Sequence, residues 1–203
     1  MNRSEQKRRT HRRIVDVAVR QLGEQGLSGA AVQRIMNEAG LTHGGFYSHF
    51  DSKADLVAQA LSAALRIASE RLFRRVDHLA APDRRKRLLD AYLSPAHRDA
   101  PGAGCPLAST SADVARSSAC VRRAYEDELR KIIEHIEADF HELAGDAAHA
   151  RAVGTLAICV GGLLLARAVD DPALSDDILQ SCRQFGSGME ETRARTGEKG
   201  IRA

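Results

Sequence analysis

The sequence predicts an all-α protein. Apolar side chains recur every three or four positions along most of its 203 residues, which is the helical period. No segment shows the two-residue alternation of a β-strand, and no internal repeat is present. With 43% hydrophobic residues the chain can bury a sizeable core, in one domain or two small ones.

Basic charge is concentrated at the N-terminus. Residues 1–13 hold six Arg or Lys against one Glu, a net +5, while the whole chain carries +3, so the remainder sums to −2. A basic arm on a slightly acidic body favours contact with phosphate groups; the alternative is a solvated, disordered tail. No signal-peptide pattern follows, and the four cysteines lack the short paired spacing of a zinc site or disulfide scaffold. Both observations predict a cytoplasmic protein.

The first helix is expected from about Thr10 to Gln25, with Gly26 ending it and Ser28 suited to cap the next. Its apolar residues form one stripe that the core should bury.

Two short helices around a tight turn are predicted for residues 31–50. The first carries an apolar stripe and is followed by Gly40, which can take a positive φ just past a helix end. Thr42 is a good N-cap, so a second helix should begin at once, anchored to the core by Phe46 and Phe50. A helix-turn-helix of this kind places its second helix in the DNA major groove.

The same pattern would also fit a plain helical hairpin, but two features favour DNA binding. Gly44 and Gly45 each cost about 1 kcal/mol in a helix relative to alanine, which is explained if the backbone approaches a partner closely. The other side chains of this helix carry hydroxyl, imidazole and phenol groups, which reach phosphates and base edges.

The string AGLTHGGFYSHFDSKADL, at residues 39–56, resembles the DNA-binding domain of the TetR family of bacterial transcriptional regulators. The resemblance implies a TetR-like all-helical homodimer. A three-helix DNA-binding domain at residues 1–53 would be followed by a larger effector-binding and dimerisation domain at 54–192. We expect a disordered tail at 193–203.

The resemblance also implies which residues lie at the DNA. They are Thr42, His43, Gly44, Gly45, Tyr47, His49 and Lys53, with Arg8, Arg9 and Arg12 added from the basic arm. His43 and the glycine backbone would lie near base edges, and the others would hold phosphates. One departure is Ala30-Ala31, where family members usually carry a threonine or serine that contacts a phosphate.

A long helix is expected next, from Asp51 or Ser52 to about Leu79, and it would act as a lever between two domains. Lys53 in its first turn is unfavourable for the helix dipole, unless a phosphate lies nearby. A further helix starts at Pro82. Its basic run at 84–87 fits a solvated face better than a DNA contact, and residues 96–104 read as a loop.

Cys105 is the most suggestive residue of the second half. Pro106 is suited to a first helical position, which places Cys105 at an N-cap, where the helix dipole favours a reactive thiolate. Some TetR-family members that resemble this chain carry a Gly-Cys here and respond to electrophiles through it. The alternative is a packing residue. The effector candidates are Cys105, Phe73, Tyr92, Leu107 and Tyr125, and the last four fit the core better than an effector pocket.

Three more helices are expected, at about 120–143, 146–169 and 175–190. The middle one is apolar on nearly all sides and so must be buried on nearly all sides. Its uncharged run of 15 residues is short of the roughly 20 that a bilayer requires, so no membrane partner is predicted. The resemblance implies that the last two helices pair across a homodimer.

We therefore predict a homodimeric repressor that binds a double-stranded DNA operator and is released by an unidentified small-molecule effector. An alternative is a thiol-based electrophile sensor that uses Cys105, and a third is a helical carrier or enzyme. No nucleophile with a neighbouring base is recognisable, so we predict no enzyme activity and no cofactor. His135 and Asp139 lie one turn apart, but they fit a polar helix face better than a metal site.

Overall fold

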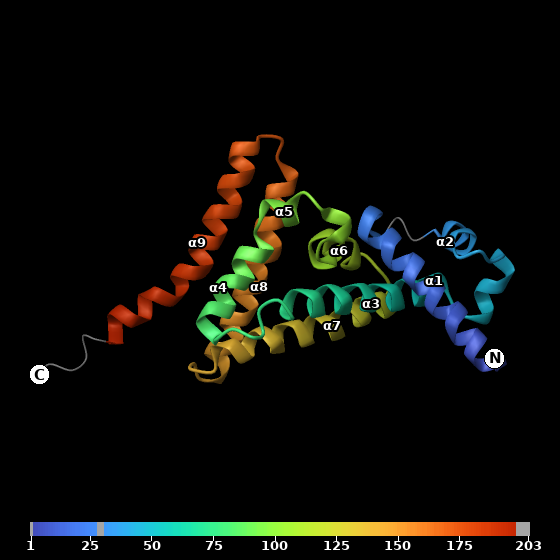
Figure 1. Ribbon diagram of the computed structural model, residues 1–203, viewed down its shortest axis with the longest axis horizontal. Coiled ribbons are helices and arrows are strands. Elements are labelled where there is room, and N and C mark those ends of the chain that lie inside the picture. Colours follow the sequence, from blue (N-terminus) through green and yellow to red (C-terminus); the bar gives the residue numbers. More distant parts are fainter. Residues whose placement is uncertain (1, 28–30, 198–203) are drawn as a thin grey trace, which may run out of the picture. The chain divides into compact units, whose positions relative to one another are not determined.

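The computed structural model describes residues 2–27 and 31–197, without the side chains of residues 43, 103 and 189–197 (Figure 1). Helices make up most of the described ranges, and no strand occurs in them. The all-α prediction is therefore confirmed.

The chain folds as two compact units. The first unit consists of Met1–Arg71 and Ala100–Lys131, and the second of Leu72–Asp99 and Ile132–Ala203. The functional division expected at residue 53 stays a prediction, because these units describe packing alone.

The first unit contains the predicted helix-turn-helix. Its elements are α1 (Arg3–Gln25), α2 (Val32–Glu38), the 3₁₀ helix η2 (His43–Ser48), α3 (Lys53–Phe73) up to residue 71, η3 (Pro101–Ala103), α6 (Pro106–Val114) and α7 (Ala119–Glu137) up to residue 131. Ile14, Ile35 and Phe46 are among its fully buried side chains. The apolar stripes read from the sequence thus meet in one core.

The N-terminal basic segment is helical from Arg3 onward, seven residues before the predicted start of α1 at Thr10. Asn2 caps this helix: its side chain accepts from the Ser4 backbone N–H, and Glu5 accepts from the backbone N–H of Asn2. This capping box satisfies backbone N–H groups at the start of α1, which keeps the first turn of the helix from fraying. The expected arm is thus the first two turns of α1, while Gly26 ends the helix as predicted, with φ of 64°.

The second unit is built on α8 (Gly145–Ala168) and α9 (Pro172–Gly197), which lie side by side in Figure 1. Its other elements are α4 (Ala81–Tyr92), α5 (Pro95–Arg98), η4 (Ala138–Phe140) and the ends of α3 and α7. Helix α3 ends at Phe73 rather than near Leu79, and residues 74–78 form turns. Helix α9 continues to Gly197, into the predicted tail, whose residues 198–203 lie outside the described part.

Helices α8 and α9 approach closely at small residues. A Cβ on Gly162 would lie 2.8 Å from Cys182 Sγ, so no side chain fits there. By length and composition α8 could cross a membrane, yet one row of its residues packs within the second unit. Its opposite side leaves large apolar side chains exposed, namely Val153, Leu164 and Leu165, and α9 exposes Leu174 and Phe185. The expectation that α8 is buried on nearly all sides is therefore not met by the chain alone.

The basic run on α4 is a solvated face only in its second half: Lys86 and Arg87 are exposed, whereas Arg84 and Arg85 are not. Arg85 is buried: it donates to the carbonyl of Asp139, pairs with Glu142 at 3.3 Å and lies 4.8 Å over the Phe140 ring. Arg84 Nε lies 2.9 Å from the buried Asp139 carboxylate. Burial raises the pKa of Asp139, and the charge of Arg84 opposes that rise. These ion pairs fix α4 against η4.

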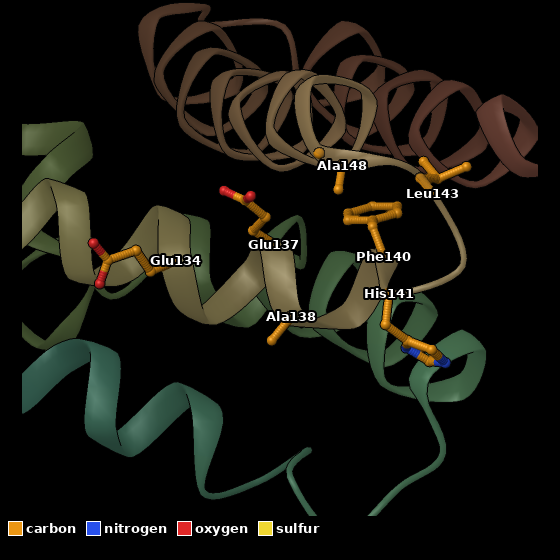
Figure 2. A pocket seen from close by; sticks show the side chains of 8 residues that line it. Glu134, Glu137, Ala138, Phe140, His141, Leu143 and Ala148 are labelled. Atoms are coloured by element: carbon orange, nitrogen blue, oxygen red, sulfur yellow. The ribbon is translucent and has the colours of Figure 1, made fainter.

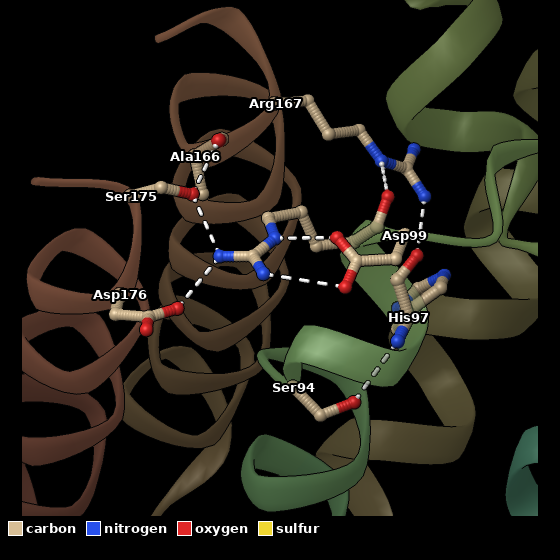
Figure 3. Close-up of polar contacts among 8 residues, drawn as sticks. Ser94, His97, Asp99, Ala166, Arg167, Ser175 and Asp176 are labelled. Carbon is tan, nitrogen blue, oxygen red and sulfur yellow. Dashed lines mark hydrogen bonds and ion pairs between the residues drawn. The ribbon is translucent and has the colours of Figure 1, made fainter. Parts of the chain in front are cut away.

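A polar clasp holds the short helix α5 against α8 and α9 (Figure 3). Arg98 donates to Ser175 Oγ at 2.9 Å, to Asp176 at 2.7 Å and to Asp99 at 2.7 Å. Arg167 on α8 donates to two carbonyl oxygens of α5, at 3.0 and 2.6 Å. A four-residue helix is not stable alone, so these side-chain bonds order it.

Candidate nucleic-acid interface

The turn between α2 and η2 is built as the sequence predicted. Gly40 has φ of 67°, the left-handed conformation that favours glycine. Its N–H donates to Asn37 O, and the N–H of Leu41 donates to Met36 O, each at 2.9 Å. This pair of bonds is the Schellman motif, which satisfies the last carbonyls of α2 and reverses the chain.

The second helix of the motif is a 3₁₀ helix of six residues rather than the α-helix that we expected. Thr42 occupies its N-cap position with extended backbone, but its side chain makes no capping hydrogen bond. Gly44 and Gly45 lower the preference for a long α-helix, and short segments often take the tighter 3₁₀ form. Helix α2 likewise begins after Ala31, which offers no side-chain cap, and Ser28 lies outside the described residues.

Two phenylalanines hold η2 on the core, as predicted. Phe46 and Phe50 are each 2% exposed, with ring centroids 5.5 Å apart. His11 of α1 stacks on Phe50 at 4.6 Å, and its Nε2 lies 2.9 Å from Gln59 Oε1 of α3. Aromatic packing and this hydrogen bond together fix η2 between α1 and α3.

Most of the predicted DNA contacts are accessible in this arrangement. Tyr47 is 71% exposed, and Thr42 and Lys53 are also exposed. Lys53 begins α3, where Ser52 Oγ accepts from the Asp55 N–H at 3.1 Å as a helix cap. The side chain of His43 lies outside the described part. Arg8, Arg9 and Arg12 are exposed on α1, and Arg8 donates to Ser4 Oγ at 2.9 Å.

Gly44 and Gly45 differ in what surrounds them. A Cβ on Gly45 would make ordinary contacts, 3.8 Å from Met36 Cε and 3.9 Å from Thr42 Oγ1. A Cβ on Gly44 would meet nothing within 4 Å, and its backbone does not take a positive φ. Nothing described in the fold therefore requires a glycine at position 44.

His49 is half-buried at the end of η2. Its Nδ1 is shielded from solvent and finds no hydrogen-bond partner among the described residues. Burial lowers the pKa of His49, and the positive charges of His11 and Lys7 lower it further. Both effects favour the neutral form of the ring.

The candidate sensor residues fall into two groups. Cys105 is the half-buried N-cap of α6, as predicted, and Leu107 on the same helix is 1% exposed. Tyr125 Oη lies 2.6 Å from Ser111 Oγ, and burial raises the pKa of Tyr125, as does the nearby Cys105. Ser111 was missed, because a serine inside a helix carries no sequence signal of its partner.

Phe73 and Tyr92 belong to the second unit and make different contacts. Phe73 stacks on His135, with ring centroids 3.8 Å apart, and His135 Nε2 lies 3.0 Å from Asp77 Oδ1. Tyr92 meets His97 edge to face at 4.6 Å. The His135 side chain is thus engaged by Phe73 and Asp77. No group of three metal-ligating side chains occurs among the described residues.

A shallow hollow of about 420 Å³ lies beside η4, and its side chains do not form a recognisable binding site (Figure 2). Phe140 faces Ala148 and is 5% exposed, whereas His141 points away from them. Glu137 accepts from or donates to His149 Nδ1 at 2.9 Å, depending on which of the two carries the proton. The polar groups of this hollow therefore do not converge on a common point.

Comparison with known proteins identifies the N-terminal segment. Residues 14–60 match the family described as "Bacterial regulatory proteins, tetR family". A stretch of 50 residues is 40% identical to the HTH-type transcriptional regulator AcrR of Shigella flexneri. That stretch is 25% of this chain and 23% of AcrR, so the match spans about a quarter of the curated relative.

The whole fold is similar to several solved structures. The TetR-family transcriptional regulator from Cytophaga hutchinsonii has a TM-score of 0.73 at 20% identity, covering 90% of this chain and 96% of that one. A TetR regulator from Chloroflexus aurantiacus gives 0.73 at 22%, covering 91% and 95%. The reduced form of E. coli NemR gives 0.72 at 19%, covering 87% and 94%. At these identities the likeness establishes the fold alone. Residues 14–60 therefore form the N-terminal domain found in the TetR family of bacterial regulatory proteins.

Proposed function

We propose that this protein is a homodimeric repressor that binds a DNA operator through α2 and η2 and leaves it when a small molecule binds. Helix η2 would enter the major groove, with His43 and the backbone of Gly44 and Gly45 near base edges. Thr42, Tyr47, His49 and Lys53 would bind phosphates, and the basic start of α1 would add further contacts. This role needs no enzyme activity and fits a cytoplasmic protein.

The observation that carries the proposal is the open space at Gly44. A Cβ there would meet no atom of the described protein within 4 Å, although alanine would favour a helix by about 1 kcal/mol. A glycine at a position where the fold does not need one is explained by a partner that approaches the backbone from outside. Tyr47 and Lys53, nearby in the sequence, are also exposed.

The direct test is selection of bound duplexes from random DNA, followed by affinity measurements on the enriched sequence. We expect a palindrome with two half-sites and an affinity that falls steeply with salt. Gly44→Ala should fold with unchanged or higher stability and yet lose at least tenfold in affinity for the palindrome. Lys53→Gln should weaken binding to all sequences and lower the salt slope by about 1 for each phosphate that Lys53 neutralises.

The matched control is Lys86→Gln, which removes the same charge from the exposed face of α4. It should leave affinity and salt slope unchanged. If no sequence were enriched, or if Gly44→Ala bound as tightly as the wild type, the repressor proposal would fail.

Contacts inside the first unit suggest how release would work. The C-terminal end of α1 packs against η3 and α6, the segment that carries Cys105. At the contact point a Cβ on Gly23 would lie 2.8 Å from the carbonyl oxygen of Gly102. A ligand or adduct that moves η3 would therefore push directly on α1, which supports the helix-turn-helix.

A thiol sensor is the second candidate function. Its support is the position of Cys105 at the N-terminus of α6, within electrostatic reach of Tyr125. The similarity to NemR, whose structure is described as a reduced form, is in keeping with it. On this proposal an electrophile would alkylate Cys105 and release the operator. Cys105→Ser should bind DNA normally and no longer respond, whereas Cys120→Ser, which removes an exposed thiol, should respond like the wild type.

If electrophile released both variants equally, or neither the variants nor the wild type, Cys105 would not be the sensor. A reversible apolar ligand would then be the effector to search for.

A further inference from the structure

A run of hydrogen bonds links α1 to α3 beside the Phe50 ring. His11 Nε2 of α1 lies 2.9 Å from Gln59 Oε1 of α3, and Gln59 Nε2 donates to Asp55 Oδ1 at 2.9 Å. The second carboxylate oxygen of Asp55 accepts from the backbone N–H of Asp51 at 3.1 Å. Asp51 directly follows Phe50, on which the His11 ring stacks with centroids 4.6 Å apart. His11, Gln59 and Asp55 thus form a polar relay that closes around Phe50, all within the first unit.

The last member of the polar relay fixes the direction of every hydrogen bond in it. A carboxylate can only accept, so the amide nitrogen of Gln59 must face Asp55 and its oxygen must face His11. An amide oxygen also only accepts, so His11 Nε2 must carry a proton. The relay therefore selects the Nε2–H form of His11 and one orientation of the Gln59 amide. Hydrogen bonds that run in one direction strengthen one another.

Packing alone does not require polar side chains at these positions. Gln59 lies between Ala58 and Ala60, which are 6% and 0% exposed, and His11 lies three residues before the fully buried Ile14. Apolar side chains could fill the same space, but the hydrophobic effect is non-directional, so apolar surfaces can slide and stay buried. A hydrogen bond weakens steeply when its angle changes. The polar relay therefore fixes one register of α1 against α3.

The polar relay is joined to η2 through two aromatic rings. Phe50 stacks on Phe46 of η2, with ring centroids 5.5 Å apart. Both rings are 2% exposed, so neither has room to move by itself. A change of register between α1 and α3 at His11 would therefore shift η2.

We propose that His11 is a positioning residue for sequence recognition: with Gln59 and Asp55 it holds η2 at the one angle at which η2 reads DNA. The inference rests on the proposed function. His11 would act through Phe50 and Phe46, without contacting DNA. Recognition groups have to be held within about 0.5 Å of their working position, so a lost register would impair discrimination between sequences before it impaired folding.

Three variants separate positioning from packing. His11→Phe keeps a ring on Phe50 and removes the donor, Gln59→Leu removes the acceptor, and the double variant replaces both with an apolar pair. Each single variant leaves one half-buried polar group without its partner, whereas the double variant removes both partners together. In denaturant unfolding we therefore expect a lower midpoint in both single variants and a recovered midpoint in the double variant.

Recognition should not recover with stability. The measurement is the affinity for the selected palindrome relative to a scrambled duplex of the same length and composition. All three variants should lose about tenfold of the wild-type preference, and the double variant should lose no more than the singles, because each change breaks the same relay. Affinity for the scrambled duplex should stay at the wild-type value, since no cation is removed.

The control is Ser62→Ala, three residues further along α3. Ser62 Oγ donates to the Ala124 carbonyl of α7 at 3.5 Å, so this variant also removes a half-buried hydrogen bond from the first unit. It should keep the full preference for the palindrome. A loss equal to that of Gln59→Leu would mean that any weakening of the unit impairs recognition. A double variant that recovered both stability and preference would mean packing alone. Either result overturns the proposal.

The protonated nitrogen of His11 gives a check that needs no DNA. Proton–nitrogen correlation spectra of the wild type at neutral pH should show a proton on His11 Nε2, with His11→Phe identifying the signals by their loss. A bare Nε2 would mean that the Gln59 amide faces the other way, which would overturn the proposal. If the wild type preferred no DNA sequence, the proposed function would fail, and this inference with it. A wild-type preference that all three variants kept would overturn the positioning role alone.

Discussion

Single residues at helix starts offer the simplest changes in this protein. Ala31 and Ala144 each occupy an N-cap position with extended backbone and provide no side-chain acceptor. Helices α2 and α8 therefore begin with unsatisfied backbone donors, which a serine or threonine would normally bind.

We predict that Ala31→Ser and Ala144→Ser each raise the free energy of unfolding by about 1 kcal/mol, because each supplies the missing cap. Only Ala31→Ser should also strengthen DNA binding, since the family resemblance implies a phosphate-contacting threonine or serine at Ala30-Ala31. Chemical denaturation and DNA titration of both variants measure the two effects. Equal DNA affinity in the two variants would show that position 31 does not reach the backbone of the DNA.

His49 should make stability depend on pH. Its pKa is lowered in the folded protein, mainly by burial and then by His11 and Lys7, so the unfolded chain takes up a proton at higher pH than the native one. The stability that neutral His49 provides is thus complete above its ordinary value of 6.5 and is lost as pH falls through that value towards the folded pKa.

We therefore expect His49→Gln to flatten the decline in unfolding free energy between neutral and mildly acidic pH. His141→Gln, which changes an exposed histidine, should leave the decline as it is in the wild type. Denaturant unfolding at a series of pH values distinguishes them. A wild-type stability that stays level across this range would contradict the prediction.

At the scale of elements, α1 and η3 meet at a tight glycine contact in the first unit. A Cβ on Gly23 would lie 2.8 Å from the Gly102 carbonyl oxygen, which is backbone and cannot rotate away. On the other side of the same contact, a Cβ on Gly102 would lie 3.6 Å from Glu24 Cγ, an ordinary distance.

Gly23→Ala should therefore destabilise the protein by about 1–3 kcal/mol through overpacking, although alanine favours a helix. Gly102→Ala should cost less, because its Cβ meets only a flexible side chain. Thermal unfolding measures both. If the contact between α1 and η3 also transmits the effector signal, Gly23→Ala should shift the effector concentration needed for release from DNA. A loss of stability without that shift would mean that this contact serves packing alone.

At the scale of the whole molecule, the exposed apolar residues of α8 and α9 remain to be accounted for. Leu165 and Phe185 are 58% and 65% exposed in the isolated chain, and Leu164 is half exposed at 50%. Large apolar groups clustered on two adjacent helices are typical of an interface rather than of a solvated surface. A second copy of the chain is the partner that the family resemblance implies.

We predict that Leu165→Glu and Phe185→Glu each convert the dimer to a monomer at micromolar concentration, because a buried unpaired charge costs more than most interface contacts provide. Ile67→Glu changes a comparably exposed residue, 49% on α3 in the first unit, and should remain dimeric. Analytical ultracentrifugation decides between these outcomes. Monomeric wild type would remove the basis for a two-half-site operator.

The sequence determined those features that depend on neighbouring residues. The helical period, the left-handed turn at Gly40, the end of α1 at Gly26 and the N-cap position of Cys105 before Pro106 all follow from local backbone preferences. The helix-turn-helix was recognisable for the same reason. Local signals were weaker at helix ends, where the Asn2 cap extended α1 and two glycines gave η2 the 3₁₀ form.

Only the tertiary structure decided which distant side chains meet. Arg85 was read as solvated because nothing near it in the sequence announces the Asp139 carbonyl or the Phe140 ring. Lys7 of α1 and His49 at the end of η2 likewise line one hollow only because the fold brings these two elements together. A charged side chain is stabilised in a core only by partners that the fold brings from far along the chain, and this long-range pairing leaves no periodic trace in the sequence.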